Sequence, residues 1–157
     1  MHPRQDIPVS NFDPERRDEL PPVPREGAGS RILLVEDDPT FSEFLAWCLA
    51  DRGYFVSTAK NIQEALELIG ELDQPGSFDI VVSDVAMPGG SGTELLFSPV
   101  ITTRKTPVVL MSAFGTTELE EFIRDANAVF LRKPFNIDSL LRCVLGQLHG
   151  SGTVAPS

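Results

Sequence analysis

The chain has 157 residues, 41% of which are hydrophobic, and it carries a formal net charge of -10 at pH 7. This length suits one soluble domain, and the negative charge disfavours nonspecific binding to nucleic acid or to anionic lipid. No apolar run approaches the roughly 20 residues that span a bilayer, and the first residues lack the apolar core of a signal peptide, so we expect a cytoplasmic protein without a membrane partner.

The two ends of the chain are predicted to be linkers. Residues 1–30 are rich in proline, carry mixed charges and contain few apolar side chains, so they cannot bury enough surface to fold alone. Residues 149–157 form a short flexible tail by the same reasoning. One domain is therefore expected over residues 31–148, and the residues after 148 are too few to form an output domain.

Between these ends, short apolar runs alternate with longer amphipathic stretches. This alternation is typical of βα units on a parallel sheet. The runs that we expect to form strands lie at residues 31–35, 54–58, 79–83, 107–111 and 128–131. The pattern predicts an α/β domain with one parallel sheet.

The first amphipathic stretch carries signals for both ends of a helix. Asp38 is expected to be the N-cap, Pro39 the first helical residue, and Gly53 the left-handed residue after the end. Trp47 lies at the rim of the inward stripe, where we favour partial core packing over the alternative of a contact with a partner. Helical periodicity predicts that this stripe consists of Phe41, Phe44, Leu45, Cys48 and Leu49.

The segment after the third strand contains the least regular part of the predicted fold. Gly89–Gly92 could suggest a phosphate-binding loop, but it follows the third strand rather than the first, so we favour a plain turn. A helix is expected to begin near Gly92. Pro99 falls inside that helix, and we therefore expect a kink or early fraying there.

Four strand ends are followed by polar residues suited to a metal and a phosphoryl group. Glu36 and Asp37 follow the first strand, Asp84 the third, Ser112 the fourth and Lys133 the fifth. Right-handed crossovers bring the carboxyl ends of parallel strands to one edge, where these side chains are expected to converge. Clustered carboxylates repel one another, and oxygen ligands with open positions favour Mg²⁺. A carboxylate can also attack phosphorus to form an aspartyl-phosphate, with the metal and Lys133 neutralising charge.

Four segments of the chain resemble the receiver domain of two-component response regulators. They are ILLVEDDP, DIVVSDVAMPGGSG, TPVVLMSA and FLRKPF, which occur in the family's order over roughly residues 31–148. The resemblance implies a doubly wound (βα)5 flavodoxin-like fold, whose five-stranded parallel sheet has the order 2-1-3-4-5. It also implies a regulatory phosphoacceptor in a phosphorelay, with no enzymatic activity beyond its own phosphorylation and dephosphorylation.

The resemblance assigns a role to each acidic residue. Asp84 is the expected phosphoacceptor, which receives a phosphoryl group from phosphohistidine on a histidine kinase or histidine phosphotransfer domain. Asp37 is the expected direct ligand of Mg²⁺, Glu36 binds the metal through water, and the backbone carbonyl of Ala86 completes the protein ligands. Ala86 and Phe114 also occupy positions that influence how long the phosphate lasts.

Further roles follow from the resemblance in the second half of the chain. Ser112 and Lys133 are expected to contact the phosphoryl group. Phe130 resembles the aromatic switch that turns inward when Ser112 moves toward the phosphate. The peptide bond between Lys133 and Pro134 is cis in this family, in line with the general preference of cis bonds for X-Pro.

Other functions compete with this interpretation. A nucleotide-binding enzyme would need a glycine-rich phosphate loop after the first strand, where this chain has Glu36-Asp37-Asp38-Pro39, which repels phosphate. A degenerate receiver that only binds other proteins would not need the acid pair, acceptor, hydroxyl and lysine that are all present here. A free-standing regulator and the receiver of a hybrid histidine kinase both fit the sequence. The proline-rich linker favours the hybrid kinase, and no oligomeric state is predicted.

Overall fold

The computed structural model of this chain describes residues 29–115 and 117–149, except for the side chains of Glu118 and Asp125. The predicted linker over residues 1–30 and the tail over residues 149–157 lie outside this part of the chain, apart from residues 29, 30 and 149. Within the described residues, no helix is both long and apolar enough to cross a membrane.

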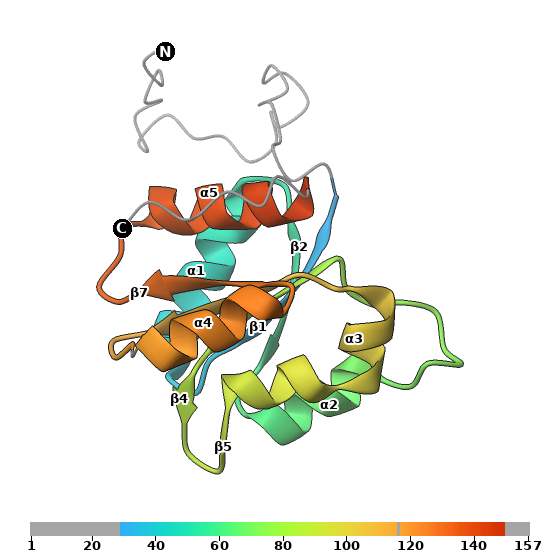
Figure 1. Ribbon diagram of the computed structural model, residues 1–157. Helices are drawn as coiled ribbons and strands as arrows, with labels where there is room; N and C mark the ends of the chain where they lie inside the picture. The colour runs from blue at the N-terminus through green and yellow to red at the C-terminus, as the bar shows by residue number, and fades with distance from the viewer. Residues whose placement is uncertain (1–28, 116, 150–157) are drawn as a thin grey trace, which may run out of the picture.

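A five-stranded parallel sheet forms the centre of the fold, and its strands lie in the order β2-β1-β3-β6-β7 (Figure 1). Strands β4 and β5 form a separate small hairpin, so the main sheet has the predicted order 2-1-3-4-5. The first strand has the predicted bounds, and the others lie within one residue of prediction. The strands of the main sheet are β1 (Arg31–Val35), β2 (Phe55–Ala59), β3 (Ile80–Asp84), β6 (Val108–Ser112) and β7 (Ala128–Arg132).

Helices cover both faces of this sheet (Figure 1). Helices α1 (Pro39–Asp51) and α5 (Ile137–Leu148) pack on one face, against alternate strand residues that include Ile32 and Leu34. The remaining helices pack on the opposite face, against residues that include Leu33 and Val35. They are α2 (Ile62–Ile69), the 3-10 helix η3 (Gly92–Phe97), α3 (Pro99–Arg104) and α4 (Thr117–Asp125). The two apolar layers hold the strand ends in one rigid frame, as expected for a doubly wound fold.

Helix α1 begins and ends where the sequence predicts. The Asp38 side chain accepts hydrogen bonds from the backbone N–H groups of Thr40 (3.0 Å) and Phe41 (3.3 Å), so Asp38 is the N-cap. Pro39 is the first helical residue, and Gly53 follows the end of the helix with a φ of 93°, a conformation that favours glycine. These caps fix the position of the helix directly after the acidic residues of β1.

The solvent-facing side of α1 differs from the prediction. Phe44 is 52% exposed and Trp47 is 68% exposed, so Phe44 does not belong to the inward stripe and partial core packing of Trp47 is wrong. The buried positions are Ser42, Leu45 and Leu49. The helix is rotated so that its buried stripe is centred on these residues, and that rotation turns both aromatic side chains toward solvent.

The segment predicted as one helix with a kink or early fraying is two separate helices. Helix η3 ends at Phe97, and Ser98 then caps α3, with its hydroxyl accepting from the N–H of Ile101 (3.5 Å). Pro99 is the first residue of α3 rather than an interior residue. The missing N–H of proline costs nothing at that position, so the chain restarts the helix there instead of bending it.

The glycine-rich segment after β3 is a plain turn, as predicted. Strands β4 (Ala86–Met87) and β5 (Gly90–Ser91) pair in antiparallel fashion, and Gly89 in the turn between them has a φ of 84°. The hairpin returns the chain to the sheet edge, where the Gly92 N–H donates to the carbonyl of Val85 (3.0 Å). A Cβ atom at Gly92 would collide with the carbonyl oxygen of Asp84, so only glycine fits this close approach.

Candidate functional site

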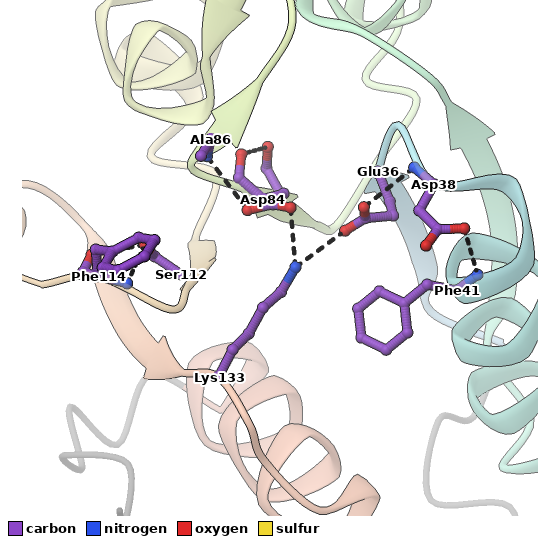
Figure 2. A network of polar contacts seen from close by, with 9 residues as sticks. Glu36, Asp38, Phe41, Asp84, Ala86, Ser112, Phe114 and Lys133 are labelled. Atoms are coloured by element: carbon purple, nitrogen blue, oxygen red, sulfur yellow. Dashed lines mark hydrogen bonds and ion pairs between the residues drawn. The ribbon is translucent and has the colours of Figure 1, made fainter.

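The predicted polar residues meet at the carboxyl-terminal edge of the sheet. Glu36 comes directly after β1, Asp84 and Ser112 are the last residues of β3 and β6, and Lys133 comes directly after β7. The strands are parallel and adjacent, so their ends deliver these residues to one place. Figure 2 shows Lys133 reaching from β7 toward Asp84 and Glu36.

Three carboxylates form the acidic part of the site. Glu36, Asp37 and Asp84 can each place one carboxylate oxygen so that all three oxygens lie within 4.8 Å of one another. Glu36 and Asp84 are buried, with exposed fractions of 3% and 6%, whereas Asp37 is exposed. The sequence predicted this grouping, and the structure adds that solvent enters from the Asp37 side.

Lys133 supplies the positive charge that faces these carboxylates. Its Nζ donates to Asp84 Oδ2 at 2.9 Å and lies 3.5 Å from Glu36 Oε2. Burial lowers the pKa of Lys133, but the hydrogen bond to Asp84 and the charges of Asp84 and Glu36 outweigh burial, so the pKa lies above its usual value. Lys133 therefore stays protonated. Its backbone N–H also donates to the carbonyl of Ser112 (2.8 Å), which ties β7 to β6 at the site.

Glu36 is the most perturbed carboxylate of the site. Burial, more than the nearby Asp84 charge, raises its pKa from 4.5 to about 7, although a hydrogen bond from the Asp38 N–H and the Lys133 charge act in the opposite direction. Its Oε1 accepts from the Asp38 N–H at 3.2 Å, while its buried Oε2 has no hydrogen-bond partner. A buried oxygen of this kind, beside two further carboxylates, fits a divalent cation with oxygen ligands such as Mg²⁺.

Both oxygens of Asp84 are engaged. Oδ1 accepts from the N–H of Ala86 (3.2 Å), and Oδ2 accepts from Lys133. The backbone carbonyl of Asp84 accepts from the Ser83 hydroxyl (2.9 Å) and lies against Gly92. Asp84 is thus held in a defined orientation, with its carboxylate directed toward Lys133 (Figure 2).

The Ser112 hydroxyl is directed away from Asp84 in this structure. It donates to the carbonyl of Phe114 (2.6 Å) and accepts from the N–H of the same residue (3.0 Å), as Figure 2 shows. The ring of Phe114 is 82% exposed. The expected contact between Ser112 and a phosphoryl group therefore stays a prediction, and it requires the hydroxyl to leave the Phe114 backbone.

Phe130, the predicted switch residue, is partly buried against the core on the α4 side. Its ring packs against Gly115, where a Cβ atom would lie 3.0 Å from the ring. The Lys133–Pro134 bond is cis, as the resemblance implies. The role of Phe130 as a switch stays a prediction.

The sequence did not reveal the aromatic neighbour of the lysine or the ring that packs on that neighbour. The Phe41 ring lies with its centroid 4.9 Å from the Lys133 Nζ, and the Phe135 ring lies 6.2 Å from the Phe41 ring. Phe41 was predicted only as part of the inward stripe of a helix. A helical stripe indicates burial but not which residue of another element is the neighbour, so no local signal could have paired Phe41 with Lys133.

Comparison with known families identifies the domain type. The chain matches the response regulator receiver domain family over residues 32–145. It is 38% identical over 116 residues to the transcriptional regulatory protein PdtaR of Mycobacterium tuberculosis. That alignment covers 73% of this chain but only 54% of PdtaR, so the chain spans about half the length of this relative.

Solved structures agree with this match. The receiver domain of the hybrid histidine kinase CckA is 34% identical, with a TM-score of 0.61, and the match covers 75% of this chain and 98% of that domain. The response regulator TrrA of Thermotoga maritima, solved in complex with Mg²⁺ and BeF, is 32% identical with a TM-score of 0.61. That match also covers 75% of this chain and 98% of TrrA.

Proposed function

Because this chain belongs to the response regulator receiver domain family, we propose that it accepts a phosphoryl group on Asp84 and thereby changes its interactions with a partner. The observation that supports this most strongly is the hydrogen bond of 2.9 Å between the buried Asp84 carboxylate and Lys133, beside two further carboxylates. The proposed donor is a phosphohistidine of a histidine kinase or phosphotransfer domain, in a phosphorelay that includes this receiver as a separate protein or within a hybrid kinase.

In the proposed reaction, one carboxylate oxygen of Asp84 attacks the phosphorus of the donor. A P–O bond forms, the P–N bond to the donor histidine breaks, and its electron pair returns to the imidazole, which takes up a proton. The hydrogen bond from Ala86 and the contact with Lys133 hold the carboxylate in place for this attack. Lys133 then pairs with a phosphoryl oxygen, so its positive charge stabilises the negative charge on the phosphoryl group.

The acidic residues fit a role in holding Mg²⁺. Asp37 would bind the ion directly, Glu36 through water, and Ala86 through its backbone carbonyl. Bound there, Mg²⁺ would neutralise the charge on the phosphoryl oxygens. Two observations support this assignment. Glu36 Oε2 is buried without a hydrogen bond, and three carboxylate oxygens lie within 4.8 Å of one another.

The neighbouring loops are proposed to change conformation when Asp84 is phosphorylated. The Ser112 hydroxyl would leave the Phe114 backbone for a phosphoryl oxygen, and Phe130, which packs on Gly115 in the same loop, would then turn inward. Ala86 donates its N–H to Asp84, Phe114 holds the Ser112 hydroxyl through its backbone, and both residues are exposed, which supports an influence on how long the phosphate lasts.

Phosphorylation by a small donor tests the proposal. The protein is incubated with acetyl phosphate and Mg²⁺, and its intact mass is measured. We expect the gain of one phosphoryl group, which Asp84→Asn should abolish and Asp73→Asn, a change at an exposed loop residue, should leave intact. A mass gain that survives Asp84→Asn would refute Asp84 as the acceptor. No gain in the unmodified protein would favour a receiver that binds partners without phosphorylation.

A further inference from the structure

An aromatic ring forms one wall around the amine of Lys133. The centroid of the Phe41 ring lies 4.9 Å from Lys133 Nζ, within the range of a cation–π contact. Figure 2 shows the ring beside the lysine, with Glu36 and Asp84 toward the end of its side chain. The amine thus lies among two carboxylates and one aromatic ring.

Neighbouring residues hold the Phe41 ring in place. Its backbone N–H donates to the Asp38 cap (3.3 Å), which places the side chain in the first turn of α1, directly beside the acidic residues. The ring is partly buried against the core on the α1 and α5 side. Phe135 packs on it with a centroid distance of 6.2 Å and an interplanar angle of 50°.

This aromatic pair joins two loops of the site. Phe41 belongs to α1, which starts just after Glu36 and Asp37, whereas Phe135 lies two residues after Lys133. The contact between the two rings therefore connects the loop that carries the acidic pair with the loop that carries the lysine.

The ring also limits which groups the amine can contact. An ammonium group has three N–H donors. Lys133 donates one hydrogen bond to Asp84 at 2.9 Å and lies 3.5 Å from Glu36 Oε2, with 24% of its side chain exposed. A ring face attracts the ammonium but offers it no strong hydrogen-bond acceptor. The amine can therefore shift from a carboxylate oxygen to a phosphoryl oxygen without leaving the ring.

We propose that Phe41 is a positioning residue for Lys133, which sets the rate of phosphoryl transfer to Asp84. The inference rests on the proposed function of the site. Replacing the ring by an aliphatic side chain of similar size keeps most of the packing but removes the attraction to the ammonium. From the size of cation–π contacts, the phosphorylation rate of Phe41→Leu is expected to fall by about 3- to 10-fold.

The rate measurement uses acetyl phosphate with saturating Mg²⁺, followed by intact mass over time. Phe41→Leu should be slow, whereas Phe41→Tyr, which restores an aromatic face, should recover most of the rate. Phe44→Leu is the matched control, because Phe44 lies on the same helix but is 52% exposed. Its rate should equal that of the unmodified protein.

A second measurement detects the contact between the Phe41 ring and Lys133 in the metal-free protein. The ring current of Phe41 should shift the ε-CH₂ proton resonances of Lys133 in the NMR spectrum. Phe41→Leu should remove this shift, and both Phe41→Tyr and Phe44→Leu should retain it.

The outcomes separate the inference from the function on which it rests. If the unmodified protein gains no phosphoryl group, the proposed function fails. If it is phosphorylated on Asp84 but Phe41→Leu reacts at the same rate, the positioning role alone is overturned. Equal slowing of Phe41→Leu and Phe41→Tyr would also overturn it, since loss of packing would then explain the effect.

Discussion

Raising the pH is expected to destabilise the metal-free protein through Glu36. Burial raises the pKa of this carboxyl to about 7 in the folded state, whereas its usual value of 4.5 applies to the unfolded chain. Between these two values the folded state binds a proton that the unfolded state has lost, so the free energy of unfolding decreases as the pH rises. The contribution of protonated Glu36 to the free energy of unfolding is fully present below pH 4.5 and is lost as the pH rises through about 7.

The size of this effect follows from the gap between the two pKa values. At 1.36 kcal/mol per pKa unit, the gap corresponds to about 3 kcal/mol when Glu36 alone is considered. This is a large share of the stability of a small domain, which is typically about 5–15 kcal/mol. The change should therefore be visible in a simple unfolding experiment.

Urea unfolding between pH 5 and pH 8, in buffer with a chelator, measures the effect. The unmodified protein should lose about 2 kcal/mol more stability over this range than Glu36→Gln, whose side chain does not titrate. Glu43→Gln serves as the control, because Glu43 lies on the exposed side of α1, and it should behave like the unmodified protein.

Adding Mg²⁺ should offset this loss of stability, since the ion would favour the charged form of Glu36. At a concentration of about 100 times its dissociation constant, the ion is expected to add about 2.7 kcal/mol at pH 8 and less at pH 5. Equal pH dependence in the unmodified protein and in Glu36→Gln would refute the reasoning, because another group would then cause it.

Two further predictions concern the backbone of Asp84, the proposed acceptor, and the surface of α1. Gly92→Ala would place a Cβ against the Asp84 carbonyl and 2.8 Å from the Ser83 hydroxyl, so we expect a loss of about 1–3 kcal/mol in urea unfolding and slower phosphorylation by acetyl phosphate. Gly89→Ala is the control, because a Cβ at this position meets no atom within 4 Å. It should cost only backbone strain of about 1–2 kcal/mol and leave the phosphorylation rate unchanged. Equal phosphorylation rates in the two variants would contradict the positional role of Gly92. Trp47→Ala should leave the rate with acetyl phosphate unchanged but slow transfer from a phosphorylated phosphotransfer domain by about fivefold or more, because an exposed tryptophan is a frequent binding hot spot. Unchanged transfer from that domain would exclude Trp47 from the interface.

Much of the fold and the grouping of the site could be predicted because the responsible signals are local. Asp38 before Pro39 marks the start of a helix, and apolar runs of strand length mark the sheet. The strands are parallel with right-handed crossovers, so residues that end neighbouring strands must meet. Glu36, Asp84 and Lys133 could therefore be placed together from the sequence alone.

The sequence by itself determined which polar groups share the site, whereas the tertiary structure decided how they are oriented. The exposure of Phe44 and Trp47 depends on the rotation of α1 about its axis, which the packing against the sheet sets. The engagement of the Ser112 hydroxyl by Phe114 depends on the path of a loop. The placement of the Phe41 ring beside Lys133 brings together residues from α1 and from the loop after β7. Such contacts depend on distances across the folded chain, which local residue patterns do not specify.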